Sequence, residues 1–275
     1  MSKVRTEYND YRIPVTAAYS EAFTHFYFAE NKSSDVITKR LLPSFQTILI
    51  FSFGEKPFLH SKEHTKIEVD KCLILGPVKQ SFDYSMPPGS EILTLNFRDD
   101  AFYRFFGSNA VAEHVPMDPV GKISEGNFMT LWNELNETDN TAARVNQILT
   151  FCDPYLEHRN KIAQQLTTFK AETLNSIKAV AGVNSQTQRN IQLNHKKHFG
   201  YSAKERNRYE RFFKAVVLIQ NLASSSSKVD WYEIVQTCGY YDQSQLIHDF
   251  KHYINLSPTQ YLKFQQDICN PMSFS

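Results

Sequence analysis

The sequence has few cysteines, glycines and prolines. It contains four cysteines, nine glycines and 11 prolines in 275 residues. No two cysteines have the Cys-X-X-Cys spacing of zinc and redox sites, so we expect buried thiols in a reducing compartment. The low glycine and proline content excludes collagen-like and low-complexity chains.

Long hydrophobic runs are also missing. The most apolar short run, Ile48–Phe51, falls far below the ~20 residues that a membrane helix needs. Residues 1–14 lack the apolar core of a signal peptide. We therefore expect a cytoplasmic protein that does not contact a membrane.

Charge of one sign does not dominate the chain, whose formal net charge is +1. This balance conceals an asymmetry. Residues 160–266 hold 14 Lys and Arg against 7 Asp and Glu, a net charge of +7, and the remainder carries −6. A basic segment beside an acidic one indicates that only the C-terminal part meets a polyanion. The alternative is a chance split between two solvated surfaces.

Short apolar runs rich in β-branched and aromatic residues dominate the first hundred residues. They span residues 47–53, 71–75 and 91–97, and glycine or proline punctuates them. Such runs predict an antiparallel β-barrel or sandwich.

A helical pattern replaces the strand pattern further along the chain. From Phe128 to Leu149 apolar residues recur at 3.6-residue spacing, which predicts two helices. Pro154 should end or kink the second helix. We predict an α+β chain of two domains, with an N-terminal β-rich domain plus helices at 1–158 and an all-α domain at 159–275.

The C-terminal part contains the same plan twice. Residues 177–202 and residues 231–258 each read as a short helix, a tight turn, a longer helix and an exit that contains serine. This is the helix-turn-helix plan, in which the second helix enters the major groove of DNA. Between the two motifs, Arg208–Leu222 predicts a linker helix of about 15 residues, ~22 Å long.

The two motifs also carry particular residues at fixed intervals. The second motif has Gly239, Tyr240, Asp242, Ser244, Leu246, Phe250, Lys251, Ser257, Pro258 and Tyr261. The first motif and the linker helix have Ala181, Arg189, Ile191, Gly200, Ser202, Arg211 and Ala215. Over residues 165–265 this pattern resembles the AraC family of bacterial transcription regulators. The chain departs from the family pattern at Leu193, His195, His248 and Asn255, where the family usually has Arg, Phe, Arg and Gly.

The N-terminal part resembles, less specifically, a cupin-like sensor domain found in some members of that family. The resemblance rests on Leu42-Pro43-Ser44, Leu75-Gly76-Pro77 and Asn96-Phe97-Arg98, which leads to Phe105-Phe106-Gly107. Together the two resemblances imply a sequence-specific DNA-binding transcription regulator that is not an enzyme. They imply double-stranded DNA as a partner, and a small-molecule effector and RNA polymerase as candidate partners.

Helical geometry separates the residues that would face DNA from those that would be buried. With Ile191 facing inward, His195, His198 and Phe199 join it on the buried side of the first long helix. In the second, Leu246, Phe250 and Tyr253 face inward. The predicted DNA-contacting residues are Arg189, Asn190, Gln192, Leu193, Lys196, Lys197, Ser244, Gln245, His248, Lys251 and His252.

Different side chains on these faces suit different contacts. Arg and Gln can hydrogen-bond to base edges, whereas Lys is better suited to phosphates. We expect Asp249 at the rim of the second helix, where it would repel phosphates and weaken the second motif. An ordinary solvated helix face is also polar and basic, but the duplication and the charge asymmetry favour DNA binding.

The β-rich part offers a candidate effector site. Phe51, Phe53, Phe82 and Tyr84 would either line a ligand pocket or pack as plain core. His60 and His64 are the only close histidine pair there, and in a strand they would lie ~13 Å apart, too far to share a metal. We expect no cofactor and no metal site.

Two alternative functions remain, and the sequence also predicts a mode of self-association. The first is a cupin-type metalloenzyme, although this sequence lacks the usual spacing of metal ligands. The second is a non-DNA-binding interaction protein with degenerate motifs, which would show no salt-dependent affinity for DNA. We also predict a homodimer through helices in residues 125–155. The apolar residues concerned are Phe128, Leu131, Trp132, Leu135, Ile148 and Leu149. The alternative is that both helices pack against their own β domain.

Overall fold

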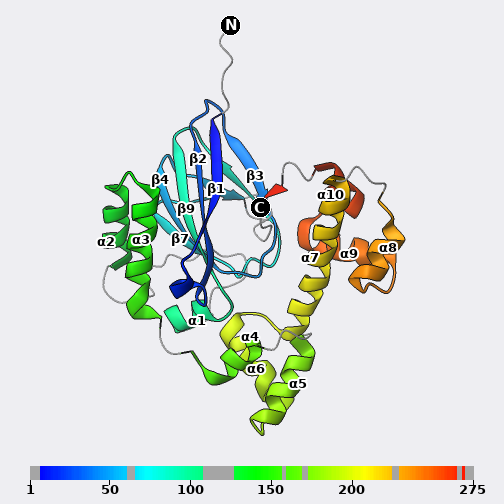
Figure 1. Cartoon of the computed structure of the whole chain (residues 1–275). Coiled ribbons are helices and arrows are strands. Elements are labelled where there is room, and N and C mark those ends of the chain that lie inside the picture. Colours follow the sequence, from blue (N-terminus) through cyan, green and yellow to red (C-terminus); the bar gives the residue numbers. More distant parts are fainter. Residues whose placement is uncertain are drawn as a thin grey trace.

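The N-terminal part of the computed structural model contains two β-sheets (Figure 1). The structure describes residues 7–60, 66–107, 127–156, 159–168, 173–224, 229–264 and 268–269. The first sheet has the order β1 (Tyr8–Pro14), β2 (Phe23–Asn31), β9 (Ser90–Phe97), β4 (Ile48–Gly54) and β7 (Cys72–Leu75). The second has the order β10 (Ile268–Cys269), β3 (Ile37–Leu41), β8 (Phe82–Met86), β5 (Phe58–His60) and β6 (Lys66–Glu68).

The sheets do not close into the barrel that we expected. Neighbouring strands are antiparallel except β10 and β3, which are parallel. Along the described strands, no backbone ladder joins one sheet to the other. One edge of β3 pairs with β10, which comes from residues 268–269. The three predicted strands are confirmed as β4, β7 and β9.

Strand β4 of the first sheet is buried on both faces, and this explains its unbroken apolar run. Alternate side chains of a strand point to opposite faces. On β4, Ile48 and Ile50 join the cluster shared with the second sheet, whereas Leu49 and Phe51 join the cluster shared with the helices. A strand covered on both sides needs apolar residues at every position. The sequence therefore shows no alternation that would tell the two faces apart.

Helices α1 (Ala101–Phe106), α2 (Asn127–Asn136) and α3 (Thr141–Cys152) belong to the cluster on the outer face of the first sheet (Figure 1). The indole N–H of Trp132 donates to the carbonyl oxygen of Ser52 at 2.9 Å. Helix α3 ends before Pro154, as predicted. The apolar residues Phe128, Leu131, Leu135, Ile148 and Leu149 are buried in this cluster. These five side chains pack within the chain, and Trp132 is partly buried against the same cluster.

The C-terminal part is helical, and its long helix α7 lies between two groups of shorter helices (Figure 1). The elements are α4 (Lys161–Thr168), α5 (Thr173–Val183), α6 (Gln188–Phe199), α7 (Ala203–Ser224), α8 (Trp231–Cys238), α9 (Gln243–Ile254) and α10 (Pro258–Phe264). Helix α7 has 22 residues and begins earlier than predicted. Its start is a capping box, because the Ser202 hydroxyl accepts from the Glu205 N–H and the Glu205 carboxylate accepts from the Ser202 N–H.

Two sequence expectations about cysteines and membranes can be compared with this fold. Cys72, Cys152 and Cys238 are buried free thiols, which confirms their packing role. Over the part of the chain that the structure covers, none of the helices combines the length and the apolar character required to cross a bilayer.

Candidate nucleic-acid interface

The second helices of the two motifs, α6 and α9, are matched in length and in the way they begin. Each has 12 residues. Thr187 precedes α6, and its side chain accepts a hydrogen bond from the N–H of Asn190. Asp242 precedes α9 and accepts in the same way from the N–H of Gln245. Such caps satisfy an N–H that the helix itself leaves unpaired. The two helices therefore correspond residue by residue from their caps onward.

Both helices also end in the same way. Gly200 follows α6 with φ 78°, and Asn255 follows α9 with φ 55°, so each residue lies in the left-handed region. The cap N–H donates to the carbonyl oxygen of Lys196 in α6 and of Lys251 in α9. Glycine and, less often, asparagine are the residues that adopt this conformation at helix ends. Asn255 can therefore serve as the cap that glycine provides in the first motif.

The predicted inner faces of α6 and α9 are confirmed. The buried residues are Ile191, His195, His198 and Phe199 in α6, and Leu246, Phe250 and Tyr253 in α9, joined by Asp249 and Ile254. The Nδ1–H of His195 donates to the carbonyl oxygen of Tyr201 at 2.9 Å. Burial lowers the pKa of His195, so this ring is a neutral structural group.

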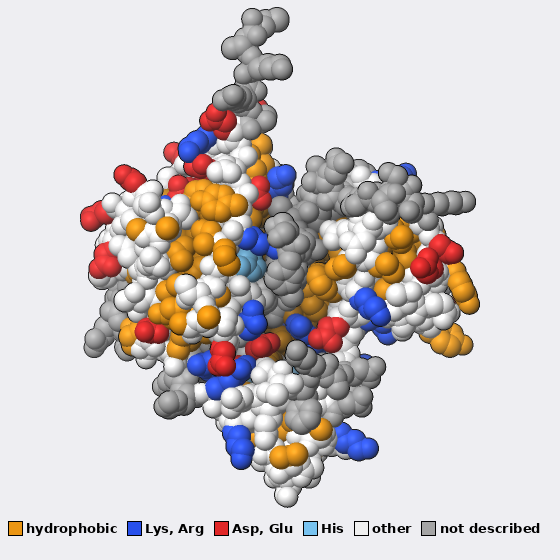
Figure 2. Space-filling model, viewed as in Figure 1, with side chains coloured by type: hydrophobic (Ala, Val, Ile, Leu, Met, Phe, Trp, Pro, Cys, Tyr) orange, Lys and Arg blue, Asp and Glu red, His pale blue; other side chains and the backbone are white. Residues whose placement is uncertain are grey.

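The structure brings the predicted DNA-contacting residues onto the outer faces of the same two helices. The exposed residues are Arg189, Asn190, Gln192, Leu193, Lys196 and Lys197 in α6, and Ser244, His248, Lys251 and His252 in α9, while Gln245 is half-buried. Gln245 accepts the Tyr241 N–H through Oε1. Figure 2 shows Lys and Arg side chains dispersed over the C-terminal part, with no single broad patch in this view.

Two exposed apolar residues in α9 and just before it were not identified from the sequence. Tyr241, before the cap of α9, is 91% exposed, and Ile247 is 38% exposed. Ile247 is the fifth residue of α9 and corresponds to Gln192 in α6. Aligning the two helices from their caps is the sequence signal that identifies this position. Apolar side chains on such a face can contact thymine methyl groups.

Asp249 does not lie at the outer rim of α9. Its side chain is 2% exposed and accepts from Arg208 Nε at 2.7 Å and from Arg211 Nη2 at 3.2 Å. Both arginines belong to α7. Asp249 is three residues after Leu246, so it shares the inward side of the helix. The carboxylate therefore fixes α9 to α7, and the predicted repulsion of phosphates was wrong.

A separate cavity of about 80 Å³ lies between the two sheets of the N-terminal part. Its lining comprises Arg12, His25, Tyr27, Leu41, Ile48, Ile50, Pro57, Leu59, Val69, Leu75, Phe82, Tyr84, Ile92, Thr94 and Asn96. Burial, with a smaller contribution from Arg12, lowers the pKa of His25 to about 4. His25 is therefore uncharged at neutral pH, and the cavity is mainly apolar.

The four predicted effector residues divide between this cavity and the opposite face of the sheet. Phe82 and Tyr84, on β8, line the cavity. Phe51 and Phe53, on β4, belong to the cluster with α2 and α3. Ile50 lines the cavity, and residues at odd distances from it along the strand, such as Phe51 and Phe53, point to the opposite face. Because β4 is apolar on both faces, only the packing of the sheets distinguishes these two sets.

The structure offers no assembled metal site within its described residues. His60 forms a hydrogen bond with the hydroxyl of Ser85 at 2.7 Å, and His64 lies outside the described residues.

Comparison with known families bears on the second motif. Residues 223–263 match the family of bacterial regulatory helix-turn-helix proteins of the AraC type. Residues 223–263 therefore carry a helix-turn-helix motif of the AraC type. The match covers the end of α7 together with α8, α9 and most of α10. The first motif lies outside the matched residues, and what it shares with the second is the length and the caps of α6 and α9.

No curated protein matches the chain. Among solved structures, ToxT from Vibrio cholerae aligns with 11% identity and a TM-score of 0.41, over 94% of this chain and 97% of that one. A structure of ToxT with bound unsaturated fatty acid aligns with 12% identity and a TM-score of 0.39, over 95% and 97% of the two chains. Likeness at this level supports no functional statement about this chain.

Replacing Asp249 with Asn should destabilise the second AraC-type motif by about 2 kcal/mol, because it removes charged hydrogen bonds from a buried carboxylate to two partly exposed arginines. Urea denaturation followed by circular dichroism measures this. Glu233→Gln, an exposed acid on α8, is the matched control and should change stability little. Unchanged stability together with tighter DNA binding would contradict the buried position of Asp249.

Proposed function

We propose that the chain is a sequence-specific DNA-binding transcription regulator that contacts two successive segments of the major groove. The observation that carries this proposal is the pair of equally capped 12-residue helices with polar, exposed outer faces. The net charge of +7 over residues 160–266 supports it, because Lys and Arg displace the counterions of DNA. No step of this function requires catalysis.

The outer face of α6 supports a division of roles. Arg189 lies in the first turn of the helix and Gln192 one turn later, where both can reach base edges. Lys196 lies in the last turn and suits a phosphate contact, which adds affinity without sequence information. In α9, Ser244 corresponds to Arg189 and Lys251 to Lys196. The second motif thus offers fewer charged groups for base contacts than the first.

The N-terminal part has the sensing role in this proposal. We divide the chain into a cupin-like sensor domain at residues 1–158 and a DNA-binding domain at 159–275. The cavity between two mostly antiparallel sheets supports a small-molecule effector. An engineered apolar cavity of about 150 Å³ holds benzene. The cavity here, of about 80 Å³, is smaller and admits only a compact, mostly apolar molecule.

Assembly and location belong to the same proposal. A homodimer would have to use surfaces other than the apolar sides of α2 and α3, because those are buried against the chain's own sheet. RNA polymerase stays a predicted partner. A regulator of this kind would meet its DNA in the cytoplasm.

The full-length chain should bind duplex DNA with an affinity that falls steeply as salt rises, with a log–log slope of about −0.9 per phosphate neutralised. Fluorescence anisotropy with a randomised duplex pool at several salt concentrations measures this. Lys196→Ala should reduce the slope by about 1. Undetectable binding at low salt would reject the regulator and favour a protein-interaction role for the two motifs.

Arg189→Ala and Gln192→Ala should each relax preference at particular base pairs, at a cost of about 1–3 kcal/mol. Lys196→Ala should weaken binding to all sequences alike, and it serves as the control. Selection of bound sequences from a random pool with each variant measures the preferences. If both variants select the wild-type sequence with undiminished preference, α6 does not read bases.

Xenon should enter the cavity between the sheets, because a dry apolar cavity binds it. We expect a protein-dependent shift in the ¹²⁹Xe NMR signal. Val69→Phe fills the cavity and should abolish the shift, whereas Val145→Phe makes the same change in the helix-side cluster and should keep it. A wild-type chain without the shift would argue against an accessible effector cavity.

A further inference from the structure

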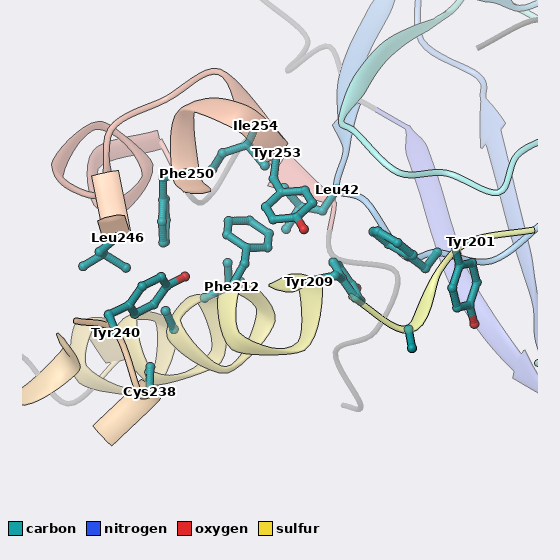
Figure 3. Close-up of a cluster of buried hydrophobic side chains, with 14 of the residues drawn as sticks. Leu42, Tyr201, Tyr209, Phe212, Cys238, Tyr240, Leu246, Phe250, Tyr253 and Ile254 are labelled. Atoms are coloured by element: carbon teal, nitrogen blue, oxygen red, sulfur yellow. The ribbon is translucent and has the colours of Figure 1, made fainter. Parts of the chain in front are cut away.

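A loop of the N-terminal part is buried in the core of the DNA-binding region. Leu42 and Phe45 lie between β3 and β4, yet they belong to the same buried cluster as Phe212 of α7 and Phe250 of α9. Figure 3 shows Leu42 next to Tyr253 within this cluster. The DNA-binding region therefore completes its hydrophobic core with side chains from the other domain.

The ring of Phe45 contacts one aromatic ring from each of three elements. It stacks on Tyr209 of α7, with ring centres 4.4 Å apart. It meets Tyr201, at the exit of the first motif, edge-on at 5.2 Å. It also meets Tyr253 of α9, in the second motif, at 6.4 Å. One side chain thus touches both motifs and the helix that joins them.

The backbone holds Phe45 in this position. Phe45 has φ 57°, a left-handed conformation that is unfavourable for a residue with a side chain. The N–H groups of Ser44 and Phe45 both donate to the carbonyl oxygen of Val78 at 3.0 Å, and the Val78 N–H donates to Gln46. An unfavourable conformation persists only where its surroundings impose it. The loop is therefore braced by the neighbouring loop at residues 76–81.

The loop at residues 76–81 also contacts the helical part at two places. We call the region where these two loops meet α6, α7 and α9 the junction. The Ser81 N–H donates to the carbonyl oxygen of Tyr253 at 2.8 Å. A Cβ atom on Gly200, which caps α6, would lie 3.3 Å from the ring of Pro77. The contacts from the N-terminal part thus reach the end of α6 and the end of α9 at the same time.

An ion pair joins the same loop to the start of α7. Lys79 Nζ lies 2.8 Å from Glu205 Oε1. Burial disfavours the charged form of Glu205, but the hydrogen bonds from Lys79 and Ser202 outweigh this and lower its pKa to about 2. Figure 2 shows acidic and basic side chains meeting where the two parts of the chain adjoin.

The angle between the two motifs depends on what fills this junction. The first motif packs at the start of α7, and helices α8 and α9 of the second motif pack along the same helix at Arg208, Phe212 and Lys214 (Figure 1). We propose that Phe45 is a positioning residue for DNA binding, whose ring holds α6 and α9 at one separation and one rotation. This inference rests on the proposed function. It makes the N-terminal part the element that selects the spacing between two half-elements of DNA bound at once.

The test compares duplexes in which the two selected half-elements are separated by the preferred spacing or by two additional base pairs. Two base pairs rotate one half-element by about 70° around the helix axis. The full-length wild type should lose affinity about tenfold, because the second contact no longer benefits from effective concentration. Phe45→Ala should bind both duplexes with similar affinity, while its binding to a single half-element changes less than about threefold.

Three variants separate positioning from general stability. Phe45→Tyr keeps the ring and should retain the spacing preference. Phe51→Ala removes an equally buried ring that faces the helix-side cluster, and it should also retain the preference. Phe45→Leu keeps much of the buried volume but removes the ring. If Phe45→Ala does not fold, loss of the spacing preference in Phe45→Leu shows that the ring positions the two motifs.

The outcomes distinguish this inference from the proposed function. A folded Phe45→Ala or Phe45→Leu chain that keeps the tenfold spacing preference overturns the positioning role. A wild-type chain that binds DNA without any spacing preference overturns it as well and leaves the regulator standing. A wild-type chain that binds no DNA instead removes the proposed function itself.

Discussion

The stacking of Phe45 on Tyr209 is the contact on which the arrangement of the two parts depends. Aromatic side chains bury large areas and orient one another through their ring edges and faces. The Tyr209 hydroxyl also donates to the carbonyl oxygen of Pro43 at 2.9 Å, so the ring and the backbone of the same loop are fixed together. The strand ends that carry this loop and its neighbour line the cavity between the sheets, at Leu41, Ile48, Leu75 and Phe82. The cavity and the junction therefore share the same backbone.

The two motifs have matching helices but are anchored differently. The seventh residue is Asp249 in α9 and Asn194 in α6. Asp249 is buried and paired with two arginines of α7, whereas the half-buried Asn194 donates to a carbonyl oxygen of its own helix. Near the end of α6, the His198 ring instead packs on Tyr103 of the N-terminal part at 4.3 Å. Both motifs pack on α7 and contact Phe45, but the second has an additional ion pair with α7 and the first an additional aromatic contact with Tyr103.

Much of the helical C-terminal part could be predicted because its determinants are local. Inner and outer faces follow from a period of 3.6 residues, and N-caps and C-caps depend on residues within one turn. Asp249 is the exception. Its polarity indicated an outer position, but two arginines some 40 residues earlier in the chain make its burial favourable. An ion pair between distant residues has no signature in a helical period.

By itself, the sequence determined the strand-rich and helix-rich halves, the duplication, and the residues on each helix face, since these rest on contacts within a few residues. Only the tertiary structure decided that the strands form two separate sheets, because strand order depends on pairing between distant segments, such as β10 with β3. It also decided that Phe51 faces the helices and that Phe82 faces the cavity. Strand β4 is apolar on both faces, so its sequence does not indicate which side chains face the cavity. The sequence around Phe45 predicts only a loop residue. Its burial depends on contacts with distant segments of the chain, which the local sequence does not indicate.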